Sequence, residues 1–167
     1  EKLVELLNDQ VNKEFYSAYL YLSMANYYNE EGLSGFGNWF TIQAQEERDH
    51  AMLFLEYLQN NGAHVELKTV EAPKKQFKEF KDPLNESLKH ERYVTASIHN
   101  IYAAASNVKD FRTMQFLDWF VKEQGEEEKT AEDLIKKLEL FGQDGKGLYM
   151  LDSELASRTY SAPTLTL

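Results

Sequence analysis

Five side chains occupy the positions in this sequence that are best suited to chemistry. They are Glu14, Glu47, His50, Glu91 and Glu127. Each of them interrupts a helical stripe that is otherwise apolar or aromatic along steps of three and four residues. A buried carboxylate is costly unless it is paired or neutralised, and several carboxylates aimed at one interior region repel one another. A bound multivalent cation makes the same arrangement favourable, so the pattern indicates a metal site.

The donor types restrict the choice of metal. Carboxylate oxygens with one imidazole suit iron or manganese better than a soft metal, with zinc as a competitor. Glu47 and His50 are three residues apart, so they lie on one helical face and can share a metal. The five groups are enough for two metals and leave coordination positions open for water or dioxygen. Taken singly, each residue has a common alternative, because a mid-helix acid is usually solvated and a lone histidine usually packs or forms hydrogen bonds.

Four long helical segments carry these residues. The apolar periodicity predicts helices over about residues 2–31, 34–61, 82–107 and 111–141. The turn-rich stretch GQDGKG follows, then a short helix over about 148–157 and an irregular tail over 158–167. The buried stripe of the fourth helix is expected to run from Phe116 to Phe141.

Capping residues predict where the helices begin and end. We expect Ser34 to cap the N-terminus of the second helix and Gly62 to end that helix. Asp82 is expected to cap the third helix, with Pro83 at the first helical position. Gly142 is expected to end the fourth helix.

The lengths of the connections predict the topology. The first and second helices are joined by a few residues, as are the third and fourth, so each pair should be antiparallel. Between the pairs lie residues 63–81; about 20 extended residues reach about 60 Å, whereas a helix of about 26 residues is about 39 Å long. We therefore predict an all-α, single-domain protein over 1–167. Its four-helix bundle, over about 2–141, has a long crossover between helices two and three and is followed by the short fifth helix.

The composition excludes several classes of protein. The chain has 28 acids against 18 Lys and Arg residues, a formal net charge of -10, and no basic tract, which argues against a nucleic-acid partner. It has no cysteine, which excludes disulfides, thiolate catalysis and rubredoxin-type iron sites. No uninterrupted apolar run approaches membrane-spanning length, so we expect a cytoplasmic protein without a membrane partner.

The chain also resembles the non-haem bacterial and archaeal ferritins over nearly its whole length. The matching stretches, in the same order and spacing, are NKEFYSAYLY, AQEERDHA, the KHE of the third helix, FLDWFVKEQGEEEK and GLYMLDSEL. The resemblance implies a ferritin-like di-iron site. In such a site, Glu14, Glu47 and His50 hold one iron. Glu47 bridges to a second iron, which Glu91 and Glu127 complete.

The resemblance implies further roles around the di-iron site. Gln124 lies close to it, and Tyr21 matches a tyrosine that is a candidate electron donor. Three more acids resemble the carboxylates of a neighbouring third iron site: Glu46, Glu123 and Glu126.

Some positions depart from the family pattern or have two interpretations. Thr130 stands where a histidine would complete a second Glu-x-x-His motif, so the second iron position should be weaker and more easily vacated. Arg48 stands where the haem-binding relatives carry a methionine, so we predict no haem. Trp119 matches an aromatic near the centre, with core packing as an equal alternative. Gly125, inside the fourth helix, indicates either a close backbone approach near the metals or a neutral position.

The function that the resemblance implies is iron storage. Ferrous iron would be oxidised by dioxygen or peroxide, a ferroxidase reaction, and the ferric product would form a mineral inside a homo-oligomeric shell of twenty-four subunits. The short fifth helix resembles the element that packs around the fourfold axes of such shells. Two alternatives remain. One is a ferritin-like di-iron oxidase without a storage role, and the other is a structural bundle whose acids face solvent.

Overall fold

A computed structural model describes residues 2–73 and 76–167, which contain five α-helices and no strand. The helices are α1 (Lys2–Glu30), α2 (Ser34–Asn60), α3 (Lys81–Asn107), α4 (Phe111–Phe141) and α5 (Gly145–Ala156). The bounds of the four long helices lie within two residues of the predicted ones. The prediction of an all-α protein with a short fifth helix is therefore confirmed.

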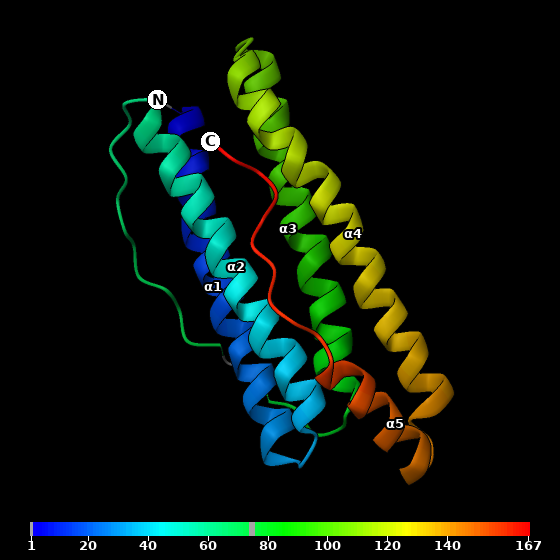
Figure 1. The fold of residues 1–167 in the computed structure, drawn as a ribbon. Helices are drawn as coiled ribbons and strands as arrows, with labels where there is room; N and C mark the ends of the chain where they lie inside the picture. The colour runs from blue at the N-terminus through cyan, green and yellow to red at the C-terminus, as the bar shows by residue number, and fades with distance from the viewer. Residues whose placement is uncertain (1, 74–75) are drawn as a thin grey trace.

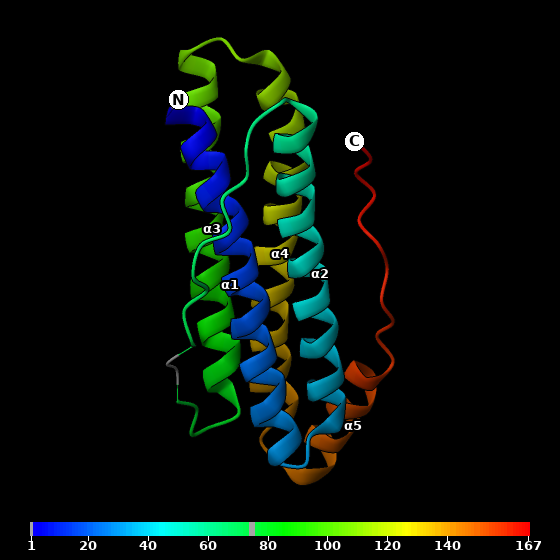
Figure 2. The same cartoon turned by 90° about the vertical axis from the view of Figure 1, so that its left-hand side faces the viewer.

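The four long helices form one bundle (Figure 1). α1 and α2 run in opposite directions and so do α3 and α4, each pair joined by a short turn. The connection from α2 to α3 passes down the outside of α1 to the opposite end of the bundle (Figure 2). Asn8 of α1 fixes this crossover, because its amide donates to the carbonyl of Glu66 at 3.0 Å and accepts from the N–H of Glu66 at 2.9 Å. The predicted long crossover is present.

The core consists of two apolar clusters with a polar layer between them. In the cluster nearer α5, the rings of Tyr28 and Phe36 have centroids 4.8 Å apart. In the other cluster, Phe54 and Phe120 have centroids 4.5 Å apart. Full burial of a side chain of this size stabilises the fold by about 1.5–3 kcal/mol. The buried acids lie at mid-height between these clusters, where apolar packing on both sides holds the helices in register.

The N-terminus of α2 is not capped as predicted. Ser34 is the first helical residue, and Leu33 at the cap position makes no side-chain cap hydrogen bond. Instead, the carboxylate of Asp152 on α5 accepts from the backbone N–H of Phe36 at 2.9 Å. A Cβ at Gly35 would lie 1.8 Å from the carbonyl oxygen of Asp152, so only glycine permits this approach. α5 therefore supplies, from 116 residues away, an acceptor that a local cap usually provides.

The predicted cap of α3 is also wrong. Phe80 occupies the cap position, so Asp82 lies inside the first turn and Pro83 is the third helical residue. The carboxylate of Asp82 accepts from the backbone N–H groups of Lys78 and Glu79 at 2.9 and 2.8 Å. The side chain thus closes the turn before the helix, and its negative charge in the first turn still complements the helix dipole.

The short fifth helix begins earlier in the chain than predicted. α5 begins at Gly145, three residues before the expected start, because the carboxylate of Asp144 accepts from the backbone N–H of Gly147 at 2.6 Å and caps the helix. The GQDGKG stretch is therefore partly helical. After α5 the chain has no helix, as predicted, and runs back along the bundle (Figure 1).

The expected end of the buried stripe on α4 is corrected as well. Phe141 is 53% exposed, and Leu138 is the last buried residue of that helix. In Figure 1 the C-terminal end of α4 moves away from α3, its antiparallel neighbour, so its last turn loses packing partners. Within the described residues, no helix combines the length and the apolarity needed to cross a membrane.

Candidate metal centre

The carboxylates and the histidine singled out in the sequence converge in the polar layer. Glu14, Glu47 and His50 are each 1% exposed, and one potential ligand atom from each lies within 4.8 Å of the other two. Glu47, Glu91 and Glu127 form a second group by the same measure. We call these two groups the inner centre. Because Glu47 belongs to both, it is placed to bridge two metal ions.

Neighbouring side chains orient the carboxylates. Tyr21 donates its hydroxyl hydrogen to Oε2 of Glu91 at 2.7 Å, and Gln124 donates from Nε2 to Oε1 of the same carboxylate at 3.3 Å. Glu14, by contrast, has one buried oxygen, Oε1, that finds no hydrogen-bond partner within the part of the chain that the structure describes. A buried polar atom without a partner is rare and costly, and the donor types around it fit a metal ligand.

Gln43 is a site residue that the sequence analysis missed. Its Nε2 donates to Oε1 of Glu47 at 3.0 Å and to Oε2 of Glu127 at 2.6 Å, so it joins the bridging carboxylate of α2 to the ligand on α4. The available signal was its position one turn before Glu47 on the same stripe. That position alone did not mark it as a site residue, because a neutral amide on a buried stripe is not an expected metal ligand.

Burial and mutual repulsion shift the pKa values of the inner centre. Burial, reinforced by the charge of Glu47, raises the pKa of Glu91 to about 8. Burial first, and neighbouring glutamates second, raise the pKa values of Glu14 and Glu127 well above the usual range. Burial opposes the charge on His50, but Glu47 prevails and raises the pKa of His50 to about 10. Burial alone would raise the pKa of Glu47, yet the charge and hydrogen bond of His50 lower it.

These shifts describe a centre in which His50 supplies too little positive charge for all of the carboxyl groups to ionise. At neutral pH, the metal-free protein keeps protons on carboxyl groups that would ionise in water. Divalent cations supply the missing charge and displace those protons. The electrostatics of the inner centre therefore favour cation binding.

A second carboxylate group lies between α2 and α4, outside the inner centre. We call Glu46, Glu123 and Glu127 the outer cluster; one oxygen from each lies within 4.8 Å of the others, and all three are partly exposed. Glu126, which the sequence also placed here, is exposed beside Glu123. Both Glu123 and Glu126 line a cavity of about 420 Å³ that reaches His50. Glu127 connects the outer cluster to the inner centre because it belongs to both.

The remaining positions singled out in the sequence have clear surroundings. The ring of Trp119 stands edge-on to His50 with centroids 5.6 Å apart and also contacts Phe120 at 4.9 Å, so it is both near the centre and packed. Thr130 is exposed, and so is Arg48. A Cβ at Gly125 would meet nothing within 4 Å, so the interpretation of a close backbone approach is wrong.

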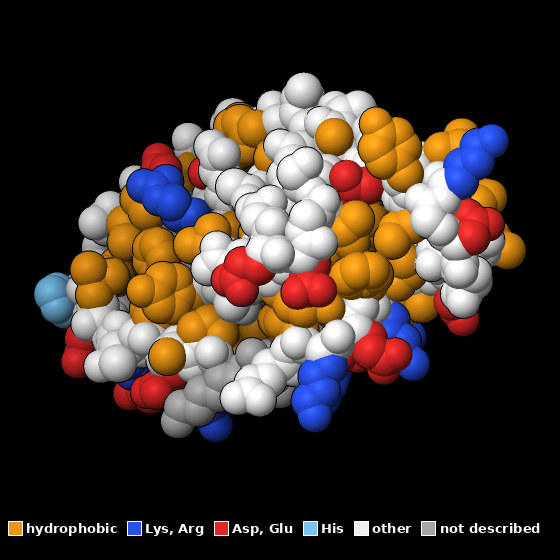
Figure 3. Space-filling model, turned by 90° about the horizontal axis from the view of Figure 1, so that it is seen from below, with side chains coloured by type: hydrophobic (Ala, Val, Ile, Leu, Met, Phe, Trp, Pro, Cys, Tyr) orange, Lys and Arg blue, Asp and Glu red, His pale blue; other side chains and the backbone are white. Residues whose placement is uncertain are grey.

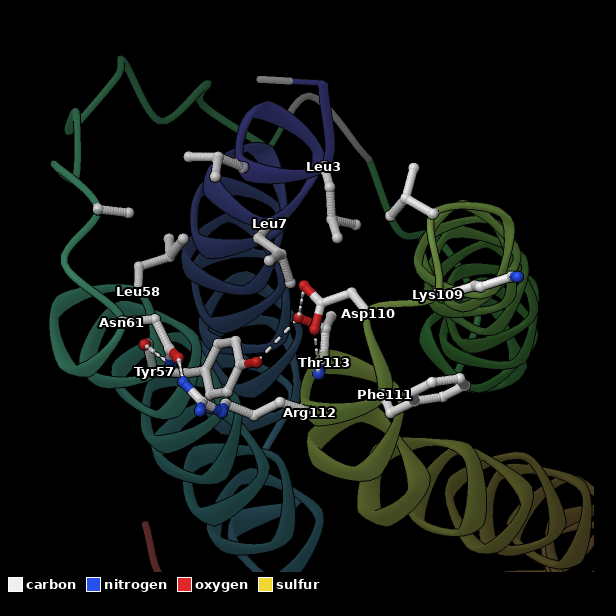
Figure 4. A pocket seen from close by; sticks show the side chains of 13 residues that line it. Leu3, Leu7, Tyr57, Leu58, Asn61, Lys109, Asp110, Phe111, Arg112 and Thr113 are labelled. Atoms are coloured by element: carbon white, nitrogen blue, oxygen red, sulfur yellow. Dashed lines mark hydrogen bonds between the residues drawn. The ribbon is translucent and has the colours of Figure 1, made fainter.

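A further cavity lies away from the carboxylates. It has a volume of about 600 Å³ and sits at the end of the bundle where α1 and α4 begin (Figure 4). Its single acid, Asp110, accepts from the backbone N–H and from the hydroxyl of Thr113, at 3.0 and 2.8 Å, and so caps α4. With that carboxylate engaged, the cavity presents no group of metal ligands.

The fold and the site together define a class. A four-helix bundle with one long crossover, and with glutamates and a histidine facing its middle, is a ferritin-like protein. A family model described as a ferritin-like domain matches residues 4–141. The chain is 40% identical over 160 residues to a bacterial non-heme ferritin of Staphylococcus aureus, covering 96% of both chains. It is 39% identical over 161 residues to one from Staphylococcus epidermidis, covering 96% of this chain and 97% of that relative.

Solved structures agree with the sequence matches. A closed form of the Archaeoglobus fulgidus ferritin, engineered by site-directed mutagenesis, superposes with a TM-score of 0.94 at 45% identity, covering 96% of this chain and 98% of that one. The open pore ferritin of the same organism superposes with a TM-score of 0.93 at 45% identity, covering 95% and 97%. The chain belongs to the ferritin family, and it is an iron-storage ferritin of the non-haem type.

Proposed function

We propose that this ferritin is a ferroxidase that oxidises ferrous iron at the inner centre. One ferrous ion binds to Glu14, Glu47 and His50. The second binds to Glu91 and Glu127 and shares Glu47 with the first. The observation that carries the proposal is the overlap of the two buried ligand groups at Glu47. Family membership supports it, because ferroxidase activity is a general property of ferritins.

The charge balance of the centre favours both loading and oxidation. Two ferrous ions replace the protons that burial holds on Glu14, Glu91 and Glu127. The carboxylates formed in this way stabilise the ferric state more than the ferrous state, because attraction grows with the charge of the ion. Each iron gives one electron to the oxidant. Dioxygen takes two electrons and two protons to form hydrogen peroxide, and hydrogen peroxide takes two electrons and two protons to form two waters.

Tyr21 is placed to supply an additional electron. Its side chain is 2% exposed, and burial, reinforced by the charge of Glu91, raises the pKa of the phenol well above its usual value. The phenol is therefore neutral at physiological pH. Together with one electron from a ferrous ion at the outer cluster, the electron of Tyr21 would complete the two-electron reduction of hydrogen peroxide to water. The phenol proton could then pass to Glu91 along the 2.7 Å hydrogen bond, which would leave a neutral tyrosyl.

The second iron position supports release of the ferric product. It has no histidine ligand, because the matching residue, Thr130, is exposed and short. Glu127 belongs both to this position and to the outer cluster, so an ion that leaves can pass from one group to the next without losing all its ligands. We propose a third iron site at the outer cluster, with Glu126 at its exposed edge.

Mineral storage requires an enclosed space that one bundle lacks. We therefore propose a homo-oligomeric shell of twenty-four subunits in the cytoplasm, which holds iron and no haem. Large apolar side chains are exposed on the last turn of α4 and on α5: Leu140 (73%), Phe141 (53%), Tyr149 (73%) and Met150 (62%). Seen from this end, apolar side chains lie exposed among charged groups (Figure 3). An exposed apolar patch of this kind supports contact between subunits around α5.

The test replaces Glu47 and His50 together by alanine. Oxidation is followed by the absorbance of the ferric product after addition of ferrous iron in air. We expect the rate to fall to that of the buffer alone, while native mass still shows a shell-sized particle. Glu56→Ala, on the exposed face of the same helix, is the matched control and should keep the parental rate. Parental oxidation by the double variant would refute the assignment of the site.

Iron content distinguishes storage from a di-iron oxidase without a storage role. After ferrous loading, the particle should retain far more iron than the two or three ions per subunit that the inner centre and outer cluster can hold. An iron content that saturates at that level would favour the oxidase.

A further inference from the structure

The segment after α5 forms a strap along the bundle. We call residues 158–165 the C-terminal strap; it runs back beside α2 and α4 (Figures 1 and 2). Its side chains bind both helices along its length. Tyr160 donates to Asp49 of α2 at 2.5 Å, and the indole of Trp119 on α4 donates to the hydroxyl of Thr164 at 2.9 Å. Leu165 packs against the apolar cluster that contains Phe54 and Phe120, the cluster farther from α5.

The first residue of the strap places a positive charge on the outer cluster. Arg158 donates from Nη2 to Oε2 of Glu46 at 3.1 Å and to Oε1 of Gln43 at 3.0 Å. Its Nη1 donates to the carbonyl of Trp39 at 3.0 Å, and its guanidinium lies 4.2 Å from the centroid of the Trp39 ring. The side chain is only 20% exposed and that of Glu46 only 17%. These contacts hold the guanidinium of Arg158 in one position beside Glu46.

Arg158 also reaches the inner centre through Gln43. The amide oxygen of Gln43 accepts from Arg158, while its Nε2 donates to Glu47 and to Glu127. The side chain of Gln43 therefore links the guanidinium to Glu47, the bridging ligand, and to Glu127, which belongs to both the inner centre and the outer cluster. The orientation of this amide is fixed from the outside by Arg158.

The rest of the strap walls the space next to the outer cluster. The cavity of about 420 Å³ has His50, Glu46 and Glu123 on the bundle side and residues 161–164 of the strap on the other. An ion that moves out from His50, Glu46 or Glu123 therefore enters a space that the strap borders on its outer side.

We propose that Arg158 competes with a metal ion for Glu46 and so lowers the affinity of the outer cluster for iron. This inference rests on the proposed function of the inner centre and outer cluster. A divalent ion bound by Glu46, Glu123 and Glu127 repels the guanidinium and takes over its carboxylate partner. Arg158 then keeps only its contacts with Trp39 and Gln43, and the strap loosens at its first residue. Weak binding at the outer cluster passes iron onward and prevents it from remaining there.

The affinity for Zn²⁺ tests the competition, since zinc binds the same donor types and undergoes no oxidation. Calorimetric titration of the assembled, metal-free protein should show two tight ions per subunit and one weaker ion. Arg158→Gln should tighten the weaker class roughly fivefold, the order expected for removal of one partly exposed ion pair. Arg158→Lys keeps the charge and should stay near the parental affinity.

Arg112→Gln is the matched control. Arg112 donates to Asn61 at 2.9 Å near the opposite end of α2, so its removal changes the net charge equally without touching the outer cluster. It should leave the weaker class unaltered. Equal tightening in the Arg112 and Arg158 variants would mean that only net charge matters and would overturn the proposal, as would an unaltered affinity in Arg158→Gln.

Tryptophan fluorescence provides a second readout that needs no variant. The chain has two tryptophans, and both contact the strap, Trp39 through Arg158 and Trp119 through Thr164. Binding of Zn²⁺ to the weaker site should change the emission of the tryptophans, because Arg158, which lies over the ring of Trp39, then leaves Glu46. An emission that stays constant through that phase would count against displacement even if the Arg158 variant failed to fold. A titration of the parent protein that showed no tight binding of two ions would instead refute the proposed function. Failure of the proposed function and failure of the Arg158 proposal are therefore distinguishable.

Discussion

Replacement of Glu91 by glutamine should flatten the pH dependence of the stability of the metal-free protein. The pKa of Glu91 is about 8 in the folded protein, against 4.5 for a glutamate exposed to water. Between these two values the folded state holds a proton that the unfolded state has released. The free energy of unfolding therefore falls as pH rises, by up to about 1.4 kcal/mol per pH unit.

The magnitude follows from the same two values. Between about pH 5 and pH 6.5, Glu91 alone should lower the free energy of unfolding by about 2 kcal/mol. The carboxyls of Glu14 and Glu127, whose pKa values are also raised, act in the same direction. His50 contributes less than Glu91 in this range, because its pKa is about 10 in the folded protein and 6.5 for a histidine exposed to water, so only near pH 6.5 does the unfolded state release this proton. Its own effect, a further loss of stability with rising pH, is largest between its two pKa values of 6.5 and about 10.

Urea denaturation in the presence of a chelator measures this effect. Glutamine keeps one side-chain oxygen that can accept the hydrogen bond of Tyr21 but loses the acceptor of the 3.3 Å contact from Gln124. That loss lowers the stability equally at every pH, so the change in slope reports the ionisation alone. We expect the loss of stability across the range to be smaller by about 2 kcal/mol in Glu91→Gln than in the parent protein. Glu56→Gln, on the exposed face of α2, should retain the parental slope. Parallel slopes for Glu91→Gln and the parent would refute the reasoning that burial keeps this carboxyl protonated.

Two further predictions concern the electron donor and the docking of α5. Tyr21→Phe should preserve the first round of ferrous oxidation in stopped-flow measurements but slow later rounds, because the donor is missing; equal rates in all rounds would exclude the donor role. Gly35→Ala should lower the free energy of unfolding in urea by about 1–3 kcal/mol, since the new Cβ would lie 1.8 Å from the carbonyl oxygen of Asp152. Gly125→Ala is its control and should stabilise by about 1 kcal/mol, because its Cβ meets nothing within 4 Å; destabilisation by both would show that the clash is not the cause.

Local periodicity carried most of the sequence-based prediction. The bounds of four long helices follow from the spacing of apolar residues, and the same spacing places Glu47 and His50 on one face of α2. The crossover follows from chain length alone, because a long connection can reach the far end of the bundle whereas a short turn cannot. These features depend on residues that are close in sequence, so each could be recognised before the fold was known.

Contacts between distant parts of the chain were decided by the tertiary structure. Steps of three and four residues show which face of α4 points inward, but only the packing shows that Glu127, and not Glu126, joins the outer cluster. The capping of helix ends also depends on tertiary contacts. The N-terminus of α2 is capped by Asp152 of α5, which lies 116 residues from Phe36 in the sequence.

The sequence by itself determined an all-α bundle with acids and one histidine along its inner faces. Only the packed structure decided which oxygens meet, that Gln43 joins two of them, and that Arg158 returns from the C-terminus to Glu46. The physical reason is that spacing along a helix sets the direction of a side chain, whereas its partner depends on how neighbouring helices and the strap pack against that face.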